Sequence, residues 1–186
     1  MKRLLPVLLV LLIFTGCGDT DSGMNRAMIL RDKLLSSNGC SFTANITADY
    51  GEKIYTFVMN CTADQDGAVS FEVVSPESIS GICGSVSAEG GKLTFDDQVL
   101  MFEMFADGQI TPVSGPWLLI RTLRGGYING CASDGTGLIL QIDDSYEEDA
   151  LRLDIRTDEN DMPIYAEILF KDRRIVSMEV ENFKFL

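Results

Sequence analysis

Histidine is absent from this sequence of 186 residues. Its absence excludes the serine–histidine and cysteine–histidine pairs of nucleophilic enzymes, and it removes the side chain that most often binds metals. Adjacent carboxylates occur, for example at Asp96-Asp97 and Asp143-Asp144, but acidic runs at strand ends are usually solvated turns. They give little support to the acid and base pair of a glycosidase. We therefore expect no catalytic residue, no metal site and no cofactor.

Basic residues are also scarce. Lysine and arginine total 15 against 28 aspartates and glutamates, which gives a formal net charge of −13. Nucleic-acid binding needs a cationic surface, and the sequence has no cluster of lysines and arginines, so we expect no nucleic-acid partner. The simplest interpretation of the acidity is solubility.

Long hydrophobic runs are missing except at the start of the chain. Lys2 and Arg3 precede an apolar run from Leu4 to Phe14. A membrane-spanning helix needs about 20 such residues, whereas a shorter run after a basic start is typical of a secretory signal peptide. Residues 1–16 are therefore predicted to be a signal peptide.

The predicted signal peptide leads into FTGC, residues 14–17. This segment resembles the bacterial lipobox, in which two small residues precede a cysteine that is lipidated on sulfur and becomes the mature N-terminus. Phe14 stands where the lipobox usually has leucine. The alternative is an ordinary signal peptide cleaved elsewhere, which would leave Cys17 as a free thiol. We expect Cys17 to be lipidated.

Lipidation would also determine the location of the protein. Stable membrane anchoring requires more than one acyl chain, and acyl chains such as palmitate on Cys17 would meet this requirement. Residues 17–24 would then be the lipidated cysteine with a polar tether, and residues 25–186 the folded domain, on the extracytoplasmic side of the cell membrane. Loss of Lys2 and Arg3 leaves 13 basic and 28 acidic residues, a net charge of −15 that repels anionic headgroups.

Four further cysteines follow, and two of them bracket a predicted β-hairpin. Across residues 40–49, apolar and polar side chains alternate, which is typical of a strand with one buried face. The alternation resumes over residues 53–61. A two-residue turn at Tyr50-Gly51 would place Cys40 directly opposite Cys61.

This register predicts a disulfide. Directly opposed residues of an antiparallel pair lie within disulfide range, and an exported chain meets oxidising conditions. We therefore expect a Cys40–Cys61 disulfide and, by elimination, a second one between Cys83 and Cys131. Two buried free thiols are the alternative for the first pair. None of these cysteines has the CxxC-like spacing of a zinc site.

The sequence pattern of the rest of the chain predicts strands and two helices. Residues 25–39 form an amphipathic pattern with Ala27, Leu30 and Leu34 on one face. Residues 114–126 begin with an early proline, end with glycines and are apolar most of the way round, so this helix should be enclosed. Alternating segments predict strands over residues 68–74, 82–88, 90–105 (two short strands), 137–143, 150–157, 164–171 and 174–186. A phase slip near Asn182 indicates a β-bulge.

Several phrases of the sequence resemble one family. They are FEVVSPESISG (71–81), GGKLTFDD (90–97), GPWLLIRTL (115–123) and PIYAEILFKDRRIVSMEVENFKF (163–185). With the order of the elements, they resemble the LolA-like superfamily of lipoprotein carriers and lipoprotein-sorting relatives. The resemblance implies a mainly β, α+β fold, in which an antiparallel β half-barrel wraps around a central helix and an N-terminal helix precedes it.

The resemblance also implies a role. In understood relatives the concave apolar face holds acyl chains of a lipid or lipoprotein, and the corresponding side chains in this sequence are Phe42, Ile46, Tyr55, Phe57, Met59, Phe71, Trp117 and Ile120. An apolar stripe at strand spacing is more often simply core. The leading hypothesis is a non-catalytic lipid-binding or acyl-binding lipoprotein.

A second hypothesis concerns protein partners. A scaffold or regulatory lipoprotein would bind an envelope or spore-coat protein through its acidic outer face or a free sheet edge. The two hypotheses differ in one respect: a carrier should leave an uncharged cleft between helix and sheet, whereas a scaffold can fill that space with its own side chains.

Overall fold

The computed structural model describes residues 19–95, 98–103, 105–106 and 109–186. The predicted signal peptide and the predicted lipidation site, Cys17, lie outside these residues. The described elements, in chain order, are α2 (Asp19–Ser36), β1 (Gly39–Asp49), β2 (Ile54–Asp64), β3 (Val69–Ser75), η1 (Glu77–Ile79), β4 (Cys83–Ser87), β5 (Gly90–Phe95), β6 (Gln98–Phe102), β7 (Phe105–Ala106), β8 (Gln109–Ile110), η2 (Pro112–Ser114), α3 (Gly115–Gly125), β9 (Tyr127–Ser133), β10 (Leu138–Asp143), β11 (Leu151–Thr157), β12 (Pro163–Phe170) and β13 (Arg173–Phe185).

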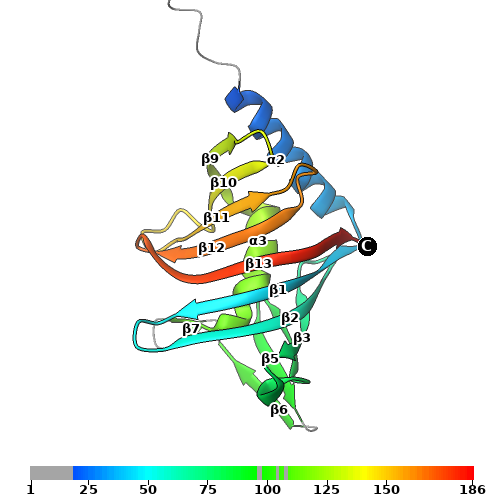
Figure 1. The fold of residues 1–186 in the computed structure, drawn as a ribbon, viewed down its shortest axis with the longest axis vertical. Coiled ribbons are helices and arrows are strands. Elements are labelled where there is room, and N and C mark those ends of the chain that lie inside the picture. Colours follow the sequence, from blue (N-terminus) through cyan, green and yellow to red (C-terminus); the bar gives the residue numbers. More distant parts are fainter. Residues whose placement is uncertain (1–18, 96–97, 104, 107–108) are drawn as a thin grey trace, which may run out of the picture.

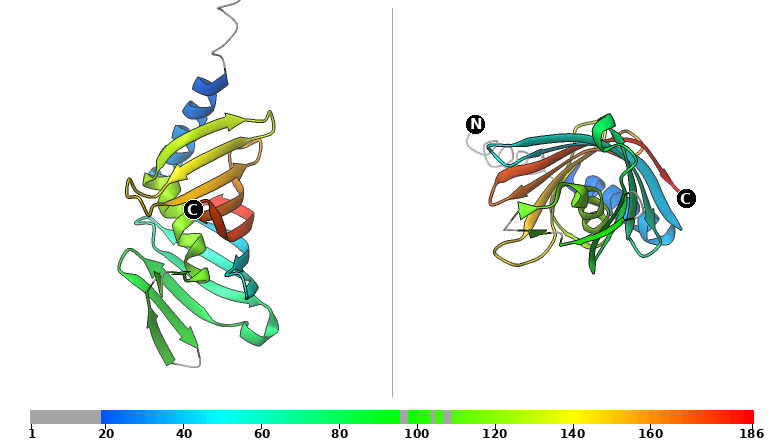
Figure 2. Two further views of the ribbon diagram at one scale, coloured as in Figure 1. Left: turned by 90° about the vertical axis from the view of Figure 1, so that its left-hand side faces the viewer. Right: turned by 90° about the horizontal axis from the view of Figure 1, so that it is seen from below.

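One antiparallel sheet of eleven strands dominates the architecture. Its order is β6-β5-β4-β3-β2-β1-β13-β12-β11-β10-β9, and β7 and β8 form a separate short pair. The sheet curls around α3 without closing (Figure 1), and the view from below shows the helix inside the curve (Figure 2). The predicted antiparallel half-barrel around a central helix is therefore confirmed.

Helix α3 is enclosed because its sequence is apolar on nearly every side. Pro116 stands in the first turn, where a missing N–H costs nothing, and the Gly126 N–H closes the last turn on the Thr122 carbonyl at 2.8 Å. Eight of its eleven residues are buried, namely Gly115, Pro116, Trp117, Leu118, Leu119, Ile120, Thr122 and Leu123. The helix thus fills the concave side of the sheet.

Helix α2 packs beside β9, at one edge of the large sheet. Ala27, Leu30 and Leu34 are buried as their spacing predicts. The helix begins at Asp19, so residues 19–24, which were expected to be part of a tether, are helical. The sequence pattern did not show this because the segment is polar and has no apolar periodicity.

The β1–β2 hairpin has a different register from the one predicted. Cys40 faces Ala63, and Cys61 faces Phe42. The connection contains four residues, because Asp49 pairs with Ile54 and the Tyr50 N–H bonds the Lys53 carbonyl at 3.0 Å. The predicted direct opposition of Cys40 and Cys61 is therefore wrong, although both side chains point into the core as expected.

The structure shows all four described cysteines as free thiols. Cys40 and Cys61 are offset by two residues between neighbouring strands, which removes the geometry from which their disulfide was predicted. Cys83 lies on β4 and Cys131 on β9, and seven strands separate these two in the sheet order. The two strands are therefore not neighbours in the sheet, and the structure shows neither thiol in a disulfide.

A β-bulge in β13 and an additional strand, β9, are the other two points at which the sequence and the structure can be compared. The β-bulge predicted near Asn182 is present: Ser41 pairs with Lys184 but Thr43 with Glu181, and Asn182 has a φ of 56°. Strand β9 was not predicted, because its sequence, YINGCAS, lacks a clear apolar alternation.

Candidate functional site

The concave face of the sheet is filled by side chains of the protein itself. Seven of the eight positions predicted to face a ligand are at most 7% exposed, namely Phe42, Ile46, Phe57, Met59, Phe71, Trp117 and Ile120. Only Tyr55 is exposed, at 46%. These seven side chains therefore belong to the packed core.

An uncharged hollow remains at the N-terminal end of α3, and we call it the end pocket. It has a volume of about 410 Å³. Its wall consists of Tyr50, Tyr55, Phe57, Ile79, Ile110, Thr111, Pro112 and Val113. The β1–β2 hairpin, η1, β8 and η2 supply these residues, none of which is charged. Of the predicted ligand-facing residues, the end pocket contains Tyr55 and Phe57.

Tyr50 holds this pocket together. Its hydroxyl donates a hydrogen bond to the carbonyl of Ile110, and its ring meets the ring of Tyr55 edge-on, with the centroids 6.0 Å apart. Burial raises the pKa of Tyr50 to about 12, so the hydroxyl stays protonated and remains a donor at neutral pH. The side chain therefore ties the hairpin to the segment that leads into α3.

The end pocket has few polar atoms, and some of these already make hydrogen bonds within the protein. The Thr111 hydroxyl donates to the Glu103 carbonyl at 2.9 Å, and the Tyr50 hydroxyl is occupied as described above. A ligand here would thus gain mainly from removal of apolar surface from water. The arrangement suits a hydrocarbon group and offers no acid, base or nucleophile.

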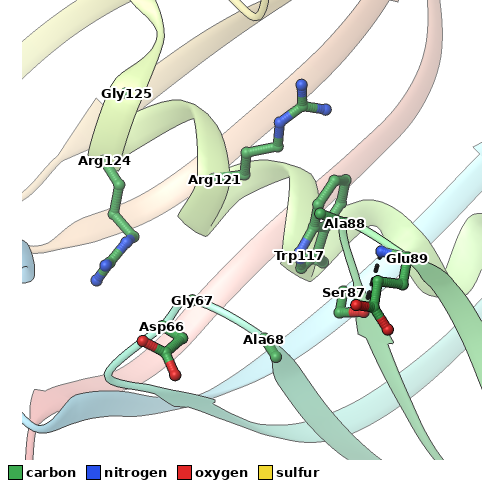
Figure 3. Close-up of a pocket in the computed structure, with 10 residues that line it drawn as sticks. All are labelled: Asp66, Gly67, Ala68, Ser87, Ala88, Glu89, Trp117, Arg121, Arg124 and Gly125. Carbon is green, nitrogen blue, oxygen red and sulfur yellow. Dashed lines mark hydrogen bonds between the residues drawn. The ribbon is translucent and has the colours of Figure 1, made fainter.

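A second hollow lies beside α3 and is polar (Figure 3). It has a volume of about 490 Å³ and is lined by Asp66, Gly67, Ala68, Ser87, Ala88, Glu89, Trp117, Arg121, Arg124 and Gly125. Figure 3 shows Arg124 projecting toward the Asp66-Gly67 turn and Arg121 projecting away from it. The carboxylates of Asp66 and Glu89 also line this hollow, so it presents both signs of charge.

The two arginines of the polar hollow already have partners within the chain. Arg124 donates to the carbonyls of Leu34 and Gln65, both at 2.9 Å, and thereby links α2, α3 and the β2–β3 turn. The Arg121 guanidinium lies 5.1 Å from the centre of the Trp117 ring. We therefore assign this hollow a structural role and take the end pocket as the candidate site.

The buried thiols give a first testable prediction. Burial raises the pKa of Cys40 to about 11 and raises that of Cys61 as well, so neither forms a reactive thiolate at neutral pH. In the native protein, a maleimide should modify the exposed Cys83 first and the half-buried Cys131 more slowly. Cys40 and Cys61 should react only after unfolding. Peptide mapping by mass spectrometry reads out each site.

The same labelling experiment tests the disulfides predicted from the sequence. In unfolded protein without reductant, all four thiols should take up label. If Cys40 and Cys61 take up label only after a reductant is added, they form a disulfide and the free-thiol state is wrong.

Neither a metal cluster nor a membrane-spanning helix is found in the described part of the chain. In these residues, no group of three or more cysteine, aspartate or glutamate side chains could hold a metal ion. None of the described helices is long and apolar enough to cross a membrane.

Comparison with known proteins gives matches only among solved structures. No family model matches, and no curated protein matches. A lipoprotein-sorting protein domain from Vibrio parahaemolyticus is 8% identical, with a TM-score of 0.49 and coverage of 90% of this chain and 93% of that one. A LolA superfamily protein from Nitrosomonas europaea is 9% identical, with a TM-score of 0.44 and coverage of 91% and 94%. The lipoprotein LppX from Mycobacterium tuberculosis is 10% identical, with a TM-score of 0.44 and coverage of 87% and 93%. The likeness is one of fold alone.

Proposed function

We propose that this protein is a lipoprotein that is anchored through Cys17 on the extracytoplasmic side of the cell membrane and binds one hydrocarbon chain of a lipid or lipoprotein in the end pocket, without catalysis. The observation that carries the proposal is the uncharged wall of this pocket around a volume of about 410 Å³. Pockets that bind small molecules have volumes of about 300–1,000 Å³ and are mostly apolar.

The packed interior limits where such a ligand can bind. Because Trp117, Ile120 and the facing strand residues are buried against one another, a chain cannot lie along the whole concave face without displacing core side chains. Displacing them would cost several kcal/mol, as truncating buried side chains does. We therefore place the hydrocarbon chain at the end of α3, next to Tyr55 and Val113.

The end pocket lies away from the predicted anchor. The C-terminal end of α3 is bound to α2, because Arg31 donates to the carbonyls of Leu123 and Gly126 at 2.8 and 2.7 Å. The end pocket lies at the opposite, N-terminal end of α3. Helix α2 begins at Asp19, two residues after Cys17. A lipidated Cys17 would thus hold the protein by one end and leave the pocket open to a lipid delivered from elsewhere.

The test is a charge placed at the rim of the end pocket. Tyr55→Asp should weaken binding of the uncharged fluorophore N-phenyl-1-naphthylamine about tenfold or more, because an unpaired carboxylate would have to be desolvated next to the ligand. Tyr55 is 46% exposed, so the variant should fold. Binding is measured by fluorescence titration, and native mass spectrometry with monopalmitoylglycerol gives the stoichiometry, expected to be one.

Ile164→Asp is the matched control, since Ile164 on β12 is also 46% exposed and does not line the end pocket. It should bind the fluorophore like the unmodified protein. Equal loss in both variants, or a protein that keeps its unliganded mass in the presence of monopalmitoylglycerol and of membrane extract, would remove the lipid-binding role.

A further inference from the structure

The two edge strands of the large sheet differ in how they are protected. At one edge, α2 lies along β9: Arg26 donates to the Ser133 hydroxyl at 3.3 Å, and a Cβ built on Gly23 would be 3.2 Å from the Cys131 sulfur. At the other edge, β6 pairs with β5 and, among the described residues, with no other strand. Natural proteins usually cover or charge a free edge, and here only one edge is covered.

Strand β6 also lacks the other common forms of edge protection. Its five residues, QVLMF, contain no lysine and no proline, and its pairing with β5 runs from Phe95↔Gln98 to Gly91↔Phe102 without a bulge. The side chains of Val99, Leu100 and Met101 are 56%, 63% and 68% exposed. Successive side chains point to opposite faces of a sheet, so β6 is apolar and uncovered on both faces.

One end of β6 packs closely against β5. A Cβ on Gly91 would lie 2.0 Å from the Phe102 ring, so Phe102 packs over the bare glycine of β5 and anchors the end of β6. In an antiparallel pair, alternate residues direct their N–H and C=O groups away from the partner strand. The outer side of β6 thus presents backbone donors and acceptors next to apolar side chains.

We propose that β6 is a docking edge that takes up an extended segment of another protein as an additional strand. Backbone groups on the outer side of β6 would bind the segment, and Val99, Leu100 and Met101 would pack against its apolar side chains. In the sequence, Asp96 and Asp97 precede β6 and Glu103 follows it. The complementary segment is therefore apolar in its centre and carries lysine or arginine at both ends.

The same charges disfavour a second copy of this chain as the occupant. Antiparallel pairing of two β6 strands brings the start of each strand to the end of the other. Each copy carries a formal net charge of −13, and Glu103 follows each β6, so edge-to-edge pairing of two copies would bring like charges together. Like charges placed directly opposite each other destabilise a strand pair, so a basic partner segment is preferred.

The position of β6 in the molecule suits such a partner. Figure 1 shows α2 beginning at one end of the molecule and β6 at the opposite end. A chain held to a membrane at its N-terminus would present β6 away from that membrane. This docking edge is separate from the end pocket, and neither Val99, Leu100 nor Met101 lines that pocket.

The test uses a fluorescein-labelled peptide with the sequence Lys-Lys-Val-Val-Thr-Val-Val-Lys-Lys, which has valines on both faces of an extended strand, and the full mature protein. Fluorescence anisotropy should show saturable binding that weakens with salt. Leu100→Lys and Met101→Lys, which alter opposite faces of β6, should each weaken binding about tenfold or more by placing a cation against the basic peptide and removing an apolar contact. Ile164→Lys is the control, and it should change binding less than about twofold.

Two further kinds of peptide separate strand addition from general attraction to an acidic protein. N-methylation of alternate residues removes backbone donors without changing charge, and it should abolish binding when the methylated side faces β6. Glutamates in place of the terminal lysines should also abolish binding. Two N-methylated peptides are needed, one methylated at the odd positions and one at the even positions. If both bind like the parent peptide, or if Ile164→Lys weakens binding as much as Leu100→Lys does, the proposal is overturned. Dimerisation of the mature protein that Leu100→Lys prevents would identify a second copy as the occupant and would also overturn it.

Discussion

Leu119→Ala is expected to lower the free energy of unfolding by about 3 kcal/mol. Leu119 lies in the middle of α3 and is 0% exposed, so its truncation removes buried methyl groups and leaves a cavity that the surrounding strands cannot readily fill. For a domain of this size, a loss of this magnitude lowers Tm by about 9 °C. Urea denaturation followed by circular dichroism measures the free energy, and a thermal scan measures Tm.

Met28→Ala is the control for this substitution. Met28 lies on α2 and is 42% exposed, so its truncation should change the stability by no more than about 0.5 kcal/mol. If Leu119→Ala were as stable as Met28→Ala, α3 could not be the centre of the core, and the half-barrel architecture would be wrong.

Cys17→Ser is expected to abolish acylation of the protein. The cysteine sulfur is the atom that receives the lipid in the lipobox reaction, and a serine hydroxyl does not replace it. In a bacterium that expresses the full chain, incorporation of an alkyne-tagged palmitate should fall to background, as measured by in-gel fluorescence after coupling. The loss is complete, because this prediction places every attached acyl chain at residue 17.

Cys83→Ser provides the matched control, because Cys83 is exposed and lies in the folded domain. It should incorporate the tagged palmitate at the level of the unmodified chain. Persistent labelling of Cys17→Ser, or loss of labelling in Cys83→Ser, would contradict the assignment of the anchor and with it the proposed location at the membrane.

The β1–β2 hairpin shows how far the sequence pattern could predict the fold. Alternation identified the buried side of both strands, since one face must leave water. It could not identify the register, because a shift by two residues keeps every side chain on the same face. The deciding groups were local: Asp49 accepts the Gly51 N–H at 2.7 Å, and the Tyr50 N–H bonds Lys53. These bonds favour a four-residue connection over the predicted two-residue turn.

The candidate site was predictable only in part. Tyr55 and Phe57 lie on the inward phase of a predicted strand, and the family resemblance implied that this face holds the ligand. Ile79 and the Ile110–Val113 segment were not, because short 3₁₀ turns and two-residue strands have no periodicity to detect. These segments meet the hairpin only in the folded chain, where Tyr50 bonds Ile110. Most other predicted ligand positions became core because α3 occupies the space that a ligand would need.

The sequence by itself determined the signal-like start, the inward side of most strands and the enclosure of the tryptophan-bearing helix, since each depends on how neighbouring residues divide between water and the interior. Only the tertiary structure decided that the interior is packed, that a hollow remains at one end of α3, and that α2 covers β9 while β6 stays open. These features arise where segments far apart in the chain meet. Local alternation shows which side chains are buried, but it does not show which other segment they pack against. Cys40 and Cys61 show the same limit: their burial was predictable, but whether they lie opposite each other depended on the register.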